Sequence, residues 1–152
     1  MEHQADVIIV GTGVAGLFCA LQLPKELHIL MITKDKAEHS DSYLAQGGIS
    51  TLRTPEDYES YFEDTMRAGH YKNNPDSVDV MIRSSPQIIQ NLIDFGVEFE
   101  RTSDGLSYTR EGAHSTFRIL HHKDITGYEI TSKLMAQVQQ RPYIQIEEYT
   151  SM

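Results

Sequence analysis

The feature that most constrains the fold is GTGVAG at residues 11–16, which lies between an apolar run and a helix-forming run. Residues 6–10 (DVIIV) are typical of a strand buried on both faces of a parallel sheet. Residues 17–23 (LFCALQL) favour a helix that Pro24 ends, and residues 27–33 (LHILMIT) form a second apolar run. The order strand, glycine turn, helix, strand predicts a βαβ unit that binds a dinucleotide.

The three glycines have separate tasks in such a unit. Gly11 permits the tight turn, Gly13 lets the backbone approach a pyrophosphate, and Gly16 lets the helix pack close to the strand. The helix N-terminus offers N–H groups and a positive dipole end to phosphates. A plain structural turn is the alternative, and the place of the segment in a βαβ pattern favours the nucleotide interpretation. The predicted cofactor-binding residues are Gly11, Thr12, Gly13, Val14, Ala15 and Gly16.

The residue after the second strand departs from the usual dinucleotide pattern. An acid that binds ribose hydroxyls is expected there, but the sequence has Lys34, followed by Asp35. This departure disfavours a standard NAD site. Lys34 is predicted either to contact the adenosine part or a phosphate of the cofactor, or to be a solvated lysine.

The rest of the chain mixes helices with short strands. Ser85-Pro86 predicts a division of residues 74–96 into two helices, because proline lacks the N–H of a helix interior. The pattern predicts an α/β fold, a Rossmann-like domain with a βαβ dinucleotide motif and inserted helices. The expected elements are a helix at 54–69, two helices in 74–96, a strand at 97–101, a turn at 103–105, a helix at 124–140 and a strand at 143–149.

Composition excludes several classes of protein. A chain of 152 residues is long enough for one domain with a core. The net charge of −9 argues against a nucleic-acid surface, and the longest apolar run, 7–10, is too short to span a bilayer. The acidic N-terminus is unlike a signal peptide, and the single cysteine, Cys19, fits a reducing cytosol.

A cluster of cationic side chains lies in residues 107–127 of this acidic chain. A metal site is one interpretation, but adjacent histidines in a strand point to opposite faces, and no zinc spacing is present. A solvated loop is another. We expect no metal. The cluster contains Arg110, Glu111, His114, Arg118, His121, His122 and Lys123.

The chain resembles the L-aspartate oxidases over essentially all of its length. The segments that carry the resemblance are GTGVAG, ITK, AQGGI, EDTMRAG, TREGAHS and RILHHKDITGYEI, in that order. These enzymes belong to the flavoprotein superfamily of succinate dehydrogenase and fumarate reductase, so the resemblance implies an FAD-binding domain. Aspartate oxidases are several times longer, so residues 1–152 are expected to be the N-terminal part of that domain, incomplete at the C-terminus. The capping and C-terminal helical domains are then absent.

The resemblance implies that SDSYLAQGG at 40–48 lies along FAD. Succinate dehydrogenase has a histidine covalently tied to the flavin at the position of Asp41, and an aspartate cannot form that bond. The implied FAD is therefore noncovalent. The residues implied to bind it are Ser40, Asp41, Ser42, Tyr43, Leu44, Ala45, Gln46, Gly47 and Gly48, with Lys34.

The resemblance also implies roles for two residues of the cationic cluster. Glu111 matches an acid that aspartate oxidases place near the substrate, where a carboxylate can pair with the α-ammonium of aspartate. Its structural alternative is an ion pair with Arg110 or Arg118. His114 matches the histidine of the family's GGHS segment, although Ala113 replaces a glycine here. Glu111 and His114 are the predicted catalytic residues.

The implied reaction is oxidation of L-aspartate to iminoaspartate, with O₂ or fumarate as the acceptor. Iminoaspartate would feed quinolinate synthase in NAD biosynthesis in the cytoplasm. The chain alone is expected to be inactive, because the family's remaining substrate-binding residues lie beyond it. Two other functions stay open: a flavoprotein acting on dicarboxylates without an amino group, which Glu111 would discriminate, and a nonenzymatic nucleotide-binding module.

Overall fold

The computed structural model describes residues 4–152. Backbone contacts divide this chain into two compact units. The sheet unit consists of residues 4–46 and 127–152, and the helical unit consists of residues 47–126.

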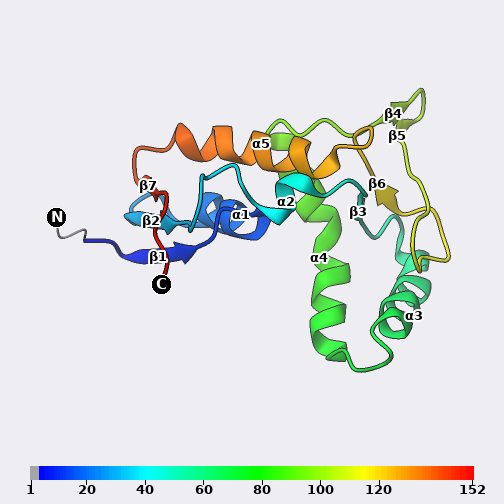
Figure 1. The fold of residues 1–152 in the computed structure, drawn as a ribbon. Coiled ribbons are helices and arrows are strands. Elements are labelled where there is room, and N and C mark those ends of the chain that lie inside the picture. Colours follow the sequence, from blue (N-terminus) through cyan, green and yellow to red (C-terminus); the bar gives the residue numbers. More distant parts are fainter. Residues whose placement is uncertain (1–3) are drawn as a thin grey trace. The chain divides into compact units, whose positions relative to one another are not determined.

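Three parallel strands form the sheet of the sheet unit, in the order β1-β2-β7. Val7 pairs with Ile29, which pairs in turn with Ile144. Helices α1 and α5 run alongside these strands (Figure 1). The predicted βαβ unit and third strand are therefore confirmed. The bounds are Val7–Val10 for β1, Val14–Gln22 for α1, Ile29–Ile32 for β2, Thr126–Gln139 for α5 and Ile144–Glu147 for β7.

Apolar side chains of α1, β2 and α5 form the core of the sheet unit. β2 is buried along most of its length, as its unbroken apolar sequence predicts. Ile8 and Val10 of β1, by contrast, are 59% and 57% exposed. The buried side chains are Leu17, Ala20, Leu21, Ile29, Met31, Ile32, Ile130, Leu134, Met135, Val138 and Ile144.

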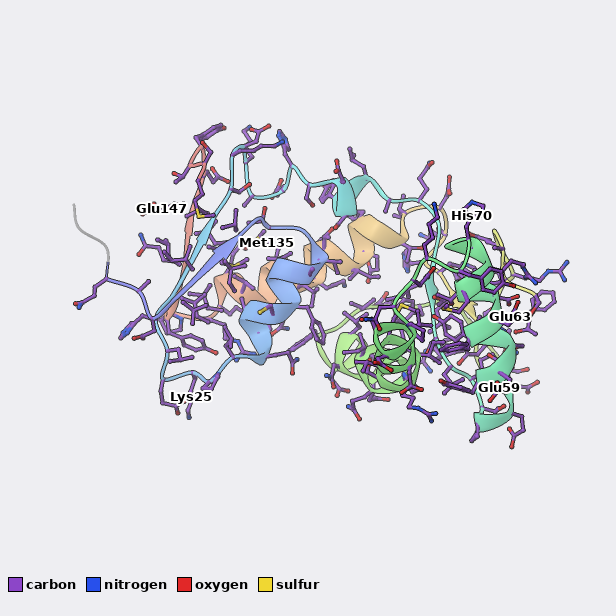
Figure 2. The ribbon with its side chains drawn as sticks, turned by 90° about the horizontal axis from the view of Figure 1, so that it is seen from below. Lys25, Glu59, Glu63, His70, Met135 and Glu147 are labelled. Carbon is purple, nitrogen blue, oxygen red and sulfur yellow. The ribbon has the colours of Figure 1, made fainter. Side chains whose placement is uncertain are left out.

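Two helices dominate the helical unit and lie side by side (Figure 1). A 3₁₀ turn, η1 (Pro55–Asp57), leads into α3 (Tyr58–Ala68), and α4 spans Pro75–Asp94. Asn74 caps α4 by accepting hydrogen bonds from the amides of Asp76 and Ser77. Glu59 and Glu63 project from the exposed face of α3 (Figure 2). The opposite face packs on α4 through a core of Tyr61, Met66, Val78 and Ile82.

Helix α4 is continuous through Pro86, so the predicted division into two helices is wrong. Pro86 has no N–H to donate to the carbonyl of Ile82, four residues earlier. The hydroxyl of Ser85 donates to that carbonyl instead, at 2.7 Å. The oxygen of Ser85 also accepts from the amide of Leu52, at 2.9 Å. The proline is therefore tolerated because its neighbour supplies the missing donor.

Short strands organise the loops of the helical unit. β3 (Ile49–Ser50) pairs antiparallel with β6 (Ile119–Leu120), and Thr109 bridges to Ile119. β4 (Arg101–Thr102) and β5 (Gly105–Leu106) form a hairpin around the predicted turn. The predicted strand at 97–101 is wrong except for Arg101, because Glu100 bonds to His121 and Ser107 instead of to a ladder. Within residues 4–152 no helix combines the length and the apolar character needed to cross a bilayer.

Candidate functional site

The glycine segment connects β1 to α1 as the sequence predicts. Gly11 has a φ of +101°, in the region that favours glycine. A Cβ on Gly16 would lie 2.3 Å from the carbonyl oxygen of Gly11, so only glycine lets the helix approach this turn. Gly13 is the N-cap of α1 and has no side chain that could accept from the amides of Ala15 and Gly16 in the first turn. That helix end therefore retains donors for an anion.

Ser42, in the predicted segment at 40–48, lies against the glycine segment. Ser40 caps the short helix α2 (Asp41–Leu44) by accepting from the amide of Tyr43, at 3.3 Å. Oγ of Ser42 accepts a hydrogen bond from the amide of Val14, at 3.2 Å. A Cβ on Gly13 would lie only 3.0 Å from the same oxygen. The structure thus brings two of the predicted cofactor segments together.

A groove of about 400 Å³ opens at the carboxyl ends of β1 and β2, where α/β sheets bind ligands. Thr12 lies in its wall, and its buried Oγ1 has no hydrogen-bond partner within residues 4–152. An orphaned buried hydroxyl fits a site that takes a polar ligand. Of the predicted cofactor residues, Gly11, Thr12, Gly13, Lys34, Ser40 and Asp41 line the groove.

The other predicted cofactor residues do not line this groove. Val14, Ala15 and Gly16 form the first turn of α1, and Ser42 acts through its bond to Val14. Tyr43 lines a smaller cavity and stacks edge-on against Tyr128. The remaining predicted residues of the segment are Leu44, Ala45 and Gln46, which are exposed, and Gly47 and Gly48, which belong to the helical unit.

Two glycines have packing tasks. A Cβ on Gly127 would lie 2.1 Å from the carbonyl oxygen of Ser42, and the amide of Gly127 donates to the carbonyl of Ala45. Gly127 is not among the residues predicted from the sequence, although its place at the start of an expected helix, after a threonine, is a usable signal. A Cβ on Gly48 would lie 2.3 Å from a methyl of Ile119, so Gly48 is needed to let β3 pair with β6.

Glu111 and His114, the predicted catalytic residues, lie in the loop between Thr109 and β6. Oε2 of Glu111 lies 3.4 Å from where a Cβ of Gly47 would stand. Glu111 forms no ion pair with Arg110 or Arg118 within the described residues, because Arg118 bonds elsewhere and Arg110 lies over the ring of Phe117. The ion pair that the sequence left open for Glu111 is therefore not formed within residues 4–152. Its role toward a substrate stays a prediction.

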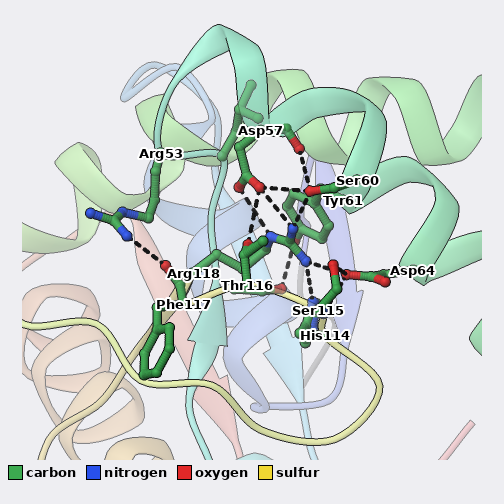
Figure 3. A network of polar contacts seen from close by, with 12 residues as sticks. Arg53, Asp57, Ser60, Tyr61, Asp64, His114, Ser115, Thr116, Phe117 and Arg118 are labelled. Atoms are coloured by element: carbon green, nitrogen blue, oxygen red, sulfur yellow. Dashed lines mark hydrogen bonds and ion pairs between the residues drawn. The ribbon is translucent and has the colours of Figure 1, made fainter.

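Arg118 is fully buried and forms the centre of a polar network (Figure 3). It binds Asp57 with two N–H···O bonds, at 2.7 and 3.0 Å. It donates to Asp64 at 2.7 Å, to Ser60 at 2.7 Å and to Nδ1 of His114 at 3.0 Å. The network attaches the loop that carries Glu111 and His114 to η1 and α3.

The same network perturbs the titration of its members. Burial raises the pKa of Asp64, but hydrogen bonds from the Ser115 amide and from Arg118 outweigh it and hold that pKa well below its usual range. The pKa of Asp57 is lowered in the same way, with burial opposed by the bonds from Arg118. Burial and the charge of Arg118 both lower the pKa of His114. Two charged aspartates and a neutral histidine therefore surround the guanidinium at neutral pH.

Asp57, Ser60 and Asp64 are not among the site residues that the sequence predicts. The available signal was their spacing. Asp57, Ser60 and Asp64 follow one another at three and four residues, so they form a polar stripe on one side of a helix. A polar stripe beside the apolar Tyr61 and Met66 indicates a buried partner of opposite charge.

Histidines 121 and 122 do not combine into a metal site. Nδ1 of His122 donates to the carbonyl of Glu98, and no group of three acidic, histidine or cysteine side chains within residues 4–152 could hold a metal ion.

Comparisons with known proteins agree with the fold and the cofactor. A family model described as the FAD binding domain matches residues 6–152. L-aspartate oxidase of Clostridium perfringens is 46% identical over the whole chain, and that of Clostridium acetobutylicum is 48% identical over 97% of it. The chain spans about a third of the length of these two relatives, 35% and 34%.

Solved structures of related proteins have the same fold. A quinol–fumarate reductase with menaquinol molecules superposes on 98% of the chain with a TM-score of 0.89 and 30% identity, and the match covers 27% of that protein. A variant of the E. coli quinol fumarate reductase gives a TM-score of 0.90 at 30% identity over the same share of this chain and 26% of its own. The predicted Rossmann-like flavoprotein fold and the predicted resemblance are confirmed.

Proposed function

Because the chain belongs to the family of FAD binding domains, FAD is its cofactor, and we propose that the chain is the FAD-binding portion of an L-aspartate oxidase. The observation that carries the proposal is the free carboxylate of Glu111 beside Gly47, in a chain 46% identical to an L-aspartate oxidase. A carboxylate without a cationic partner in the described chain suits the α-ammonium of an amino dicarboxylate.

The residues of the sheet unit fit the cofactor. Gly13 and the first turn of α1, where no described side chain caps the amides of Ala15 and Gly16, suit the pyrophosphate, because the backbone can approach it closely there. The orphaned hydroxyl of Thr12 offers a further polar contact, and the exposed Lys34 lies in the same groove. Asp41 occupies the place where succinate dehydrogenase has its flavin-bound histidine, so we propose a noncovalent FAD.

When bound, FAD supplies a hydride acceptor for the α-carbon of L-aspartate, with O₂ or fumarate as the final oxidant. The task of Glu111 is recognition. Its carboxylate binds the ammonium of the substrate and so distinguishes aspartate from succinate, which has none. The product, iminoaspartate, would be consumed by quinolinate synthase in the cytoplasm, on the route to NAD. We propose residues 1–152 as the N-terminal part of the FAD-binding domain.

A dicarboxylate reductase is the second candidate, because solved quinol fumarate reductases share the fold at 30% identity. Those proteins act on a substrate without an amino group. With such a substrate, the unpaired carboxylate of Glu111 would have no substrate ammonium to bind. The dicarboxylate reductase is therefore the weaker candidate.

The first experiment tests the cofactor. The purified chain is mixed with FAD, freed of unbound flavin and precipitated with acid. Yellow protein that releases its colour to the supernatant supports noncovalent FAD, and a yellow pellet would contradict it.

The second experiment tests the substrate. A chimera carries residues 1–152 of this chain in place of the matching segment of the Clostridium perfringens oxidase. We expect the chimera to produce peroxide with L-aspartate and not with succinate. A chimera that oxidises succinate in preference to aspartate would favour the second candidate.

A further inference from the structure

The guanidinium of Arg118 has each of its N–H groups in a hydrogen bond. Arginine carries five such donors and no acceptor. Nε donates to Oδ2 of Asp57, and Nη2 donates to Oδ1 of Asp57 and to Oγ of Ser60. Nη1 donates to Oδ2 of Asp64 and to Nδ1 of His114. The hydrogen bond between Arg118 and His114 can therefore have only one direction, in which Arg118 donates and Nδ1 of His114 accepts.

This direction fixes the imidazole. A ring nitrogen that accepts a hydrogen bond carries no proton, so the ring proton of His114 lies on Nε2. We propose that Arg118 is a positioning residue that holds His114 as the neutral Nε2–H tautomer. His114 then acts on a bound ligand as a hydrogen-bond donor, and it cannot act as a general base through Nε2.

The carboxylates fix Arg118 in turn. Asp64 accepts from Arg118, from Arg67 and twice from Ser115, which leaves no freedom for its side chain. The ring of Tyr61 packs against both Arg118 and His114. Its centroid lies 4.8 Å from the guanidinium carbon of Arg118 and 5.5 Å from the ring centroid of His114. The guanidinium therefore cannot turn away from Nδ1.

The charges around the ring favour the same state. Burial lowers the pKa of His114 and the charge of Arg118 lowers it further, while Asp64 and Asp57 oppose them. The other groups of this network, Arg67 and Tyr61, reach His114 through Asp64 and through ring packing. Asp57 and Asp64 already accept hydrogen bonds from Arg118, whose positive charge offsets theirs. They therefore stabilise a protonated His114 less than their two negative charges alone would.

Other histidines of the chain have the opposite arrangement. Nδ1 of His122 meets the carbonyl of Glu98, and Nδ1 of His39 meets the carboxylate of Asp35. An oxygen acceptor requires the proton on Nδ1. These two residues are internal controls for His114.

The ligand chemistry follows from the tautomer. Nε2 of His114 has no hydrogen-bond partner within the described part of the chain. A neutral N–H donor suits a carboxylate or carbonyl oxygen. Under the proposed function, on which this step rests, that oxygen belongs to the dicarboxylate substrate.

The test of the tautomer needs neither cofactor nor turnover. Long-range ¹H–¹⁵N correlation spectra of the chain separate Nε2–H, Nδ1–H and doubly protonated rings, and His114→Asn identifies the signals of residue 114. We expect a pure Nε2–H pattern for His114 at neutral pH and Nδ1–H for His122. An Nδ1–H pattern, an exchanging mixture or an imidazolium at residue 114 would overturn the proposal.

The role of the donor is tested in the chimera with two matched variants. His114→Gln places an N–H near the position of Nε2, whereas His114→Asn keeps only an acceptor near the position of Nδ1. We expect His114→Asn to raise the KM for aspartate by about tenfold to a hundredfold, and His114→Gln to raise it much less. Equal KM values would overturn the donor role. A chimera that binds no FAD would instead refute the proposed function and leave the spectra of the chain as the test of the tautomer.

Discussion

The backbone amide of Val14 donates a hydrogen bond to the hydroxyl of Ser42, twenty-eight residues later in the chain, at 3.2 Å. Val14 opens α1 and Ser42 lies in α2, so this bond joins the glycine segment to the segment at 40–48. It explains how two motifs that are separate in sequence form adjacent walls of one groove. It also makes the shape of that groove sensitive to small additions at Gly13.

Gly13→Val should weaken FAD binding by about tenfold or more, which corresponds to about 1.4 kcal/mol. The added Cβ would already lie 3.0 Å from Oγ of Ser42, and the branched side chain would keep a pyrophosphate from the backbone. Titration with FAD, followed by flavin fluorescence, measures the effect. Gln22→Ala, on an exposed position of the same helix, is the control and should bind FAD normally. Unchanged affinity of Gly13→Val would refute the nucleotide role of GTGVAG.

Ser85→Ala should lower the free energy of unfolding by about 1–3 kcal/mol, because it leaves the carbonyl of Ile82 and the amide of Leu52 unpaired. Ser84→Ala should cost less than about 0.5 kcal/mol, because that hydroxyl is exposed. Adding Pro86→Ala to Ser85→Ala returns a backbone N–H to Ile82 and should recover part of the loss. Urea unfolding measures all three. No recovery in the double variant would show that Ser85 does not substitute for the missing N–H of Pro86.

Asp64→Asn should destabilise the helical unit by about 3–5 kcal/mol, because it leaves a buried arginine with one charged partner fewer. The amide also offers donors where Ser115 and Arg118 already donate. Glu59→Gln, an exposed acid of the same helix, is the matched control and should change stability by less than about 0.5 kcal/mol. Thermal melts of the two variants provide the comparison, and similar melting temperatures would contradict the importance of the network.

Stability should fall as the pH is lowered from 7 toward 5, in part because of His114. The pKa of His114 lies below its ordinary value of 6.5 in the folded chain, so the unfolded chain takes up the proton first and gains stability from it. His114→Asn keeps an acceptor for Arg118 but does not titrate, and its stability should depend less on pH in this window. Denaturant titrations at several pH values measure the two slopes. Equal slopes would contradict the lowered pKa.

A second loss should follow at lower pH. The pKa values of Asp57 and Asp64 lie below their ordinary value of 3.8. Their contribution is therefore complete above about pH 4 and disappears as the pH falls through the lower values of the folded chain.

Glu111→Gln in the chimera should slow aspartate oxidation by about one to two powers of ten, because a charge-assisted bond to the ammonium contributes about 1.5–3 kcal/mol. Fumarate has no ammonium, so its reduction should be largely spared. The ratio of the two rates is the measurement, and the FAD content of the variant is the control. Equal losses would show that Glu111 has a structural role.

The sheet unit could be predicted from the sequence because its signals are local. The apolar runs of β1 and β2 and the glycines between them lie within the first 33 residues. Gly11 is required by its positive φ, and Gly13 and Gly16 by the atoms that a Cβ would meet. The expected break at Pro86 is wrong although its cause is also local. The rule that proline ends a helix considers backbone donors only, and here the side chain of the neighbouring Ser85 replaces the missing donor.

The polar network could not be predicted from local signals. Arg118 meets Asp57 and Asp64 across 61 and 54 residues, and nothing near Arg118 in sequence distinguishes it from Arg110. Its burial depends on the pairing of β3 with β6, which local patterns do not encode. The positions of Glu111 and His114 depend on the same pairing. The sequence therefore predicts Glu111 and His114 as site residues, but it does not predict the polar network that holds their loop in place.

The complete bonding of Arg118 has a consequence for motion. Rotation of a guanidinium about its Cζ–Nε bond normally averages its terminal protons, but here such a rotation would break the bonds to Asp57, Ser60, Asp64 and His114 together. The side chain is also fully shielded from water. Its terminal protons should therefore be individually resolvable and slow to exchange with solvent, and their exchange rate would time how often the loop carrying Glu111 detaches from α3.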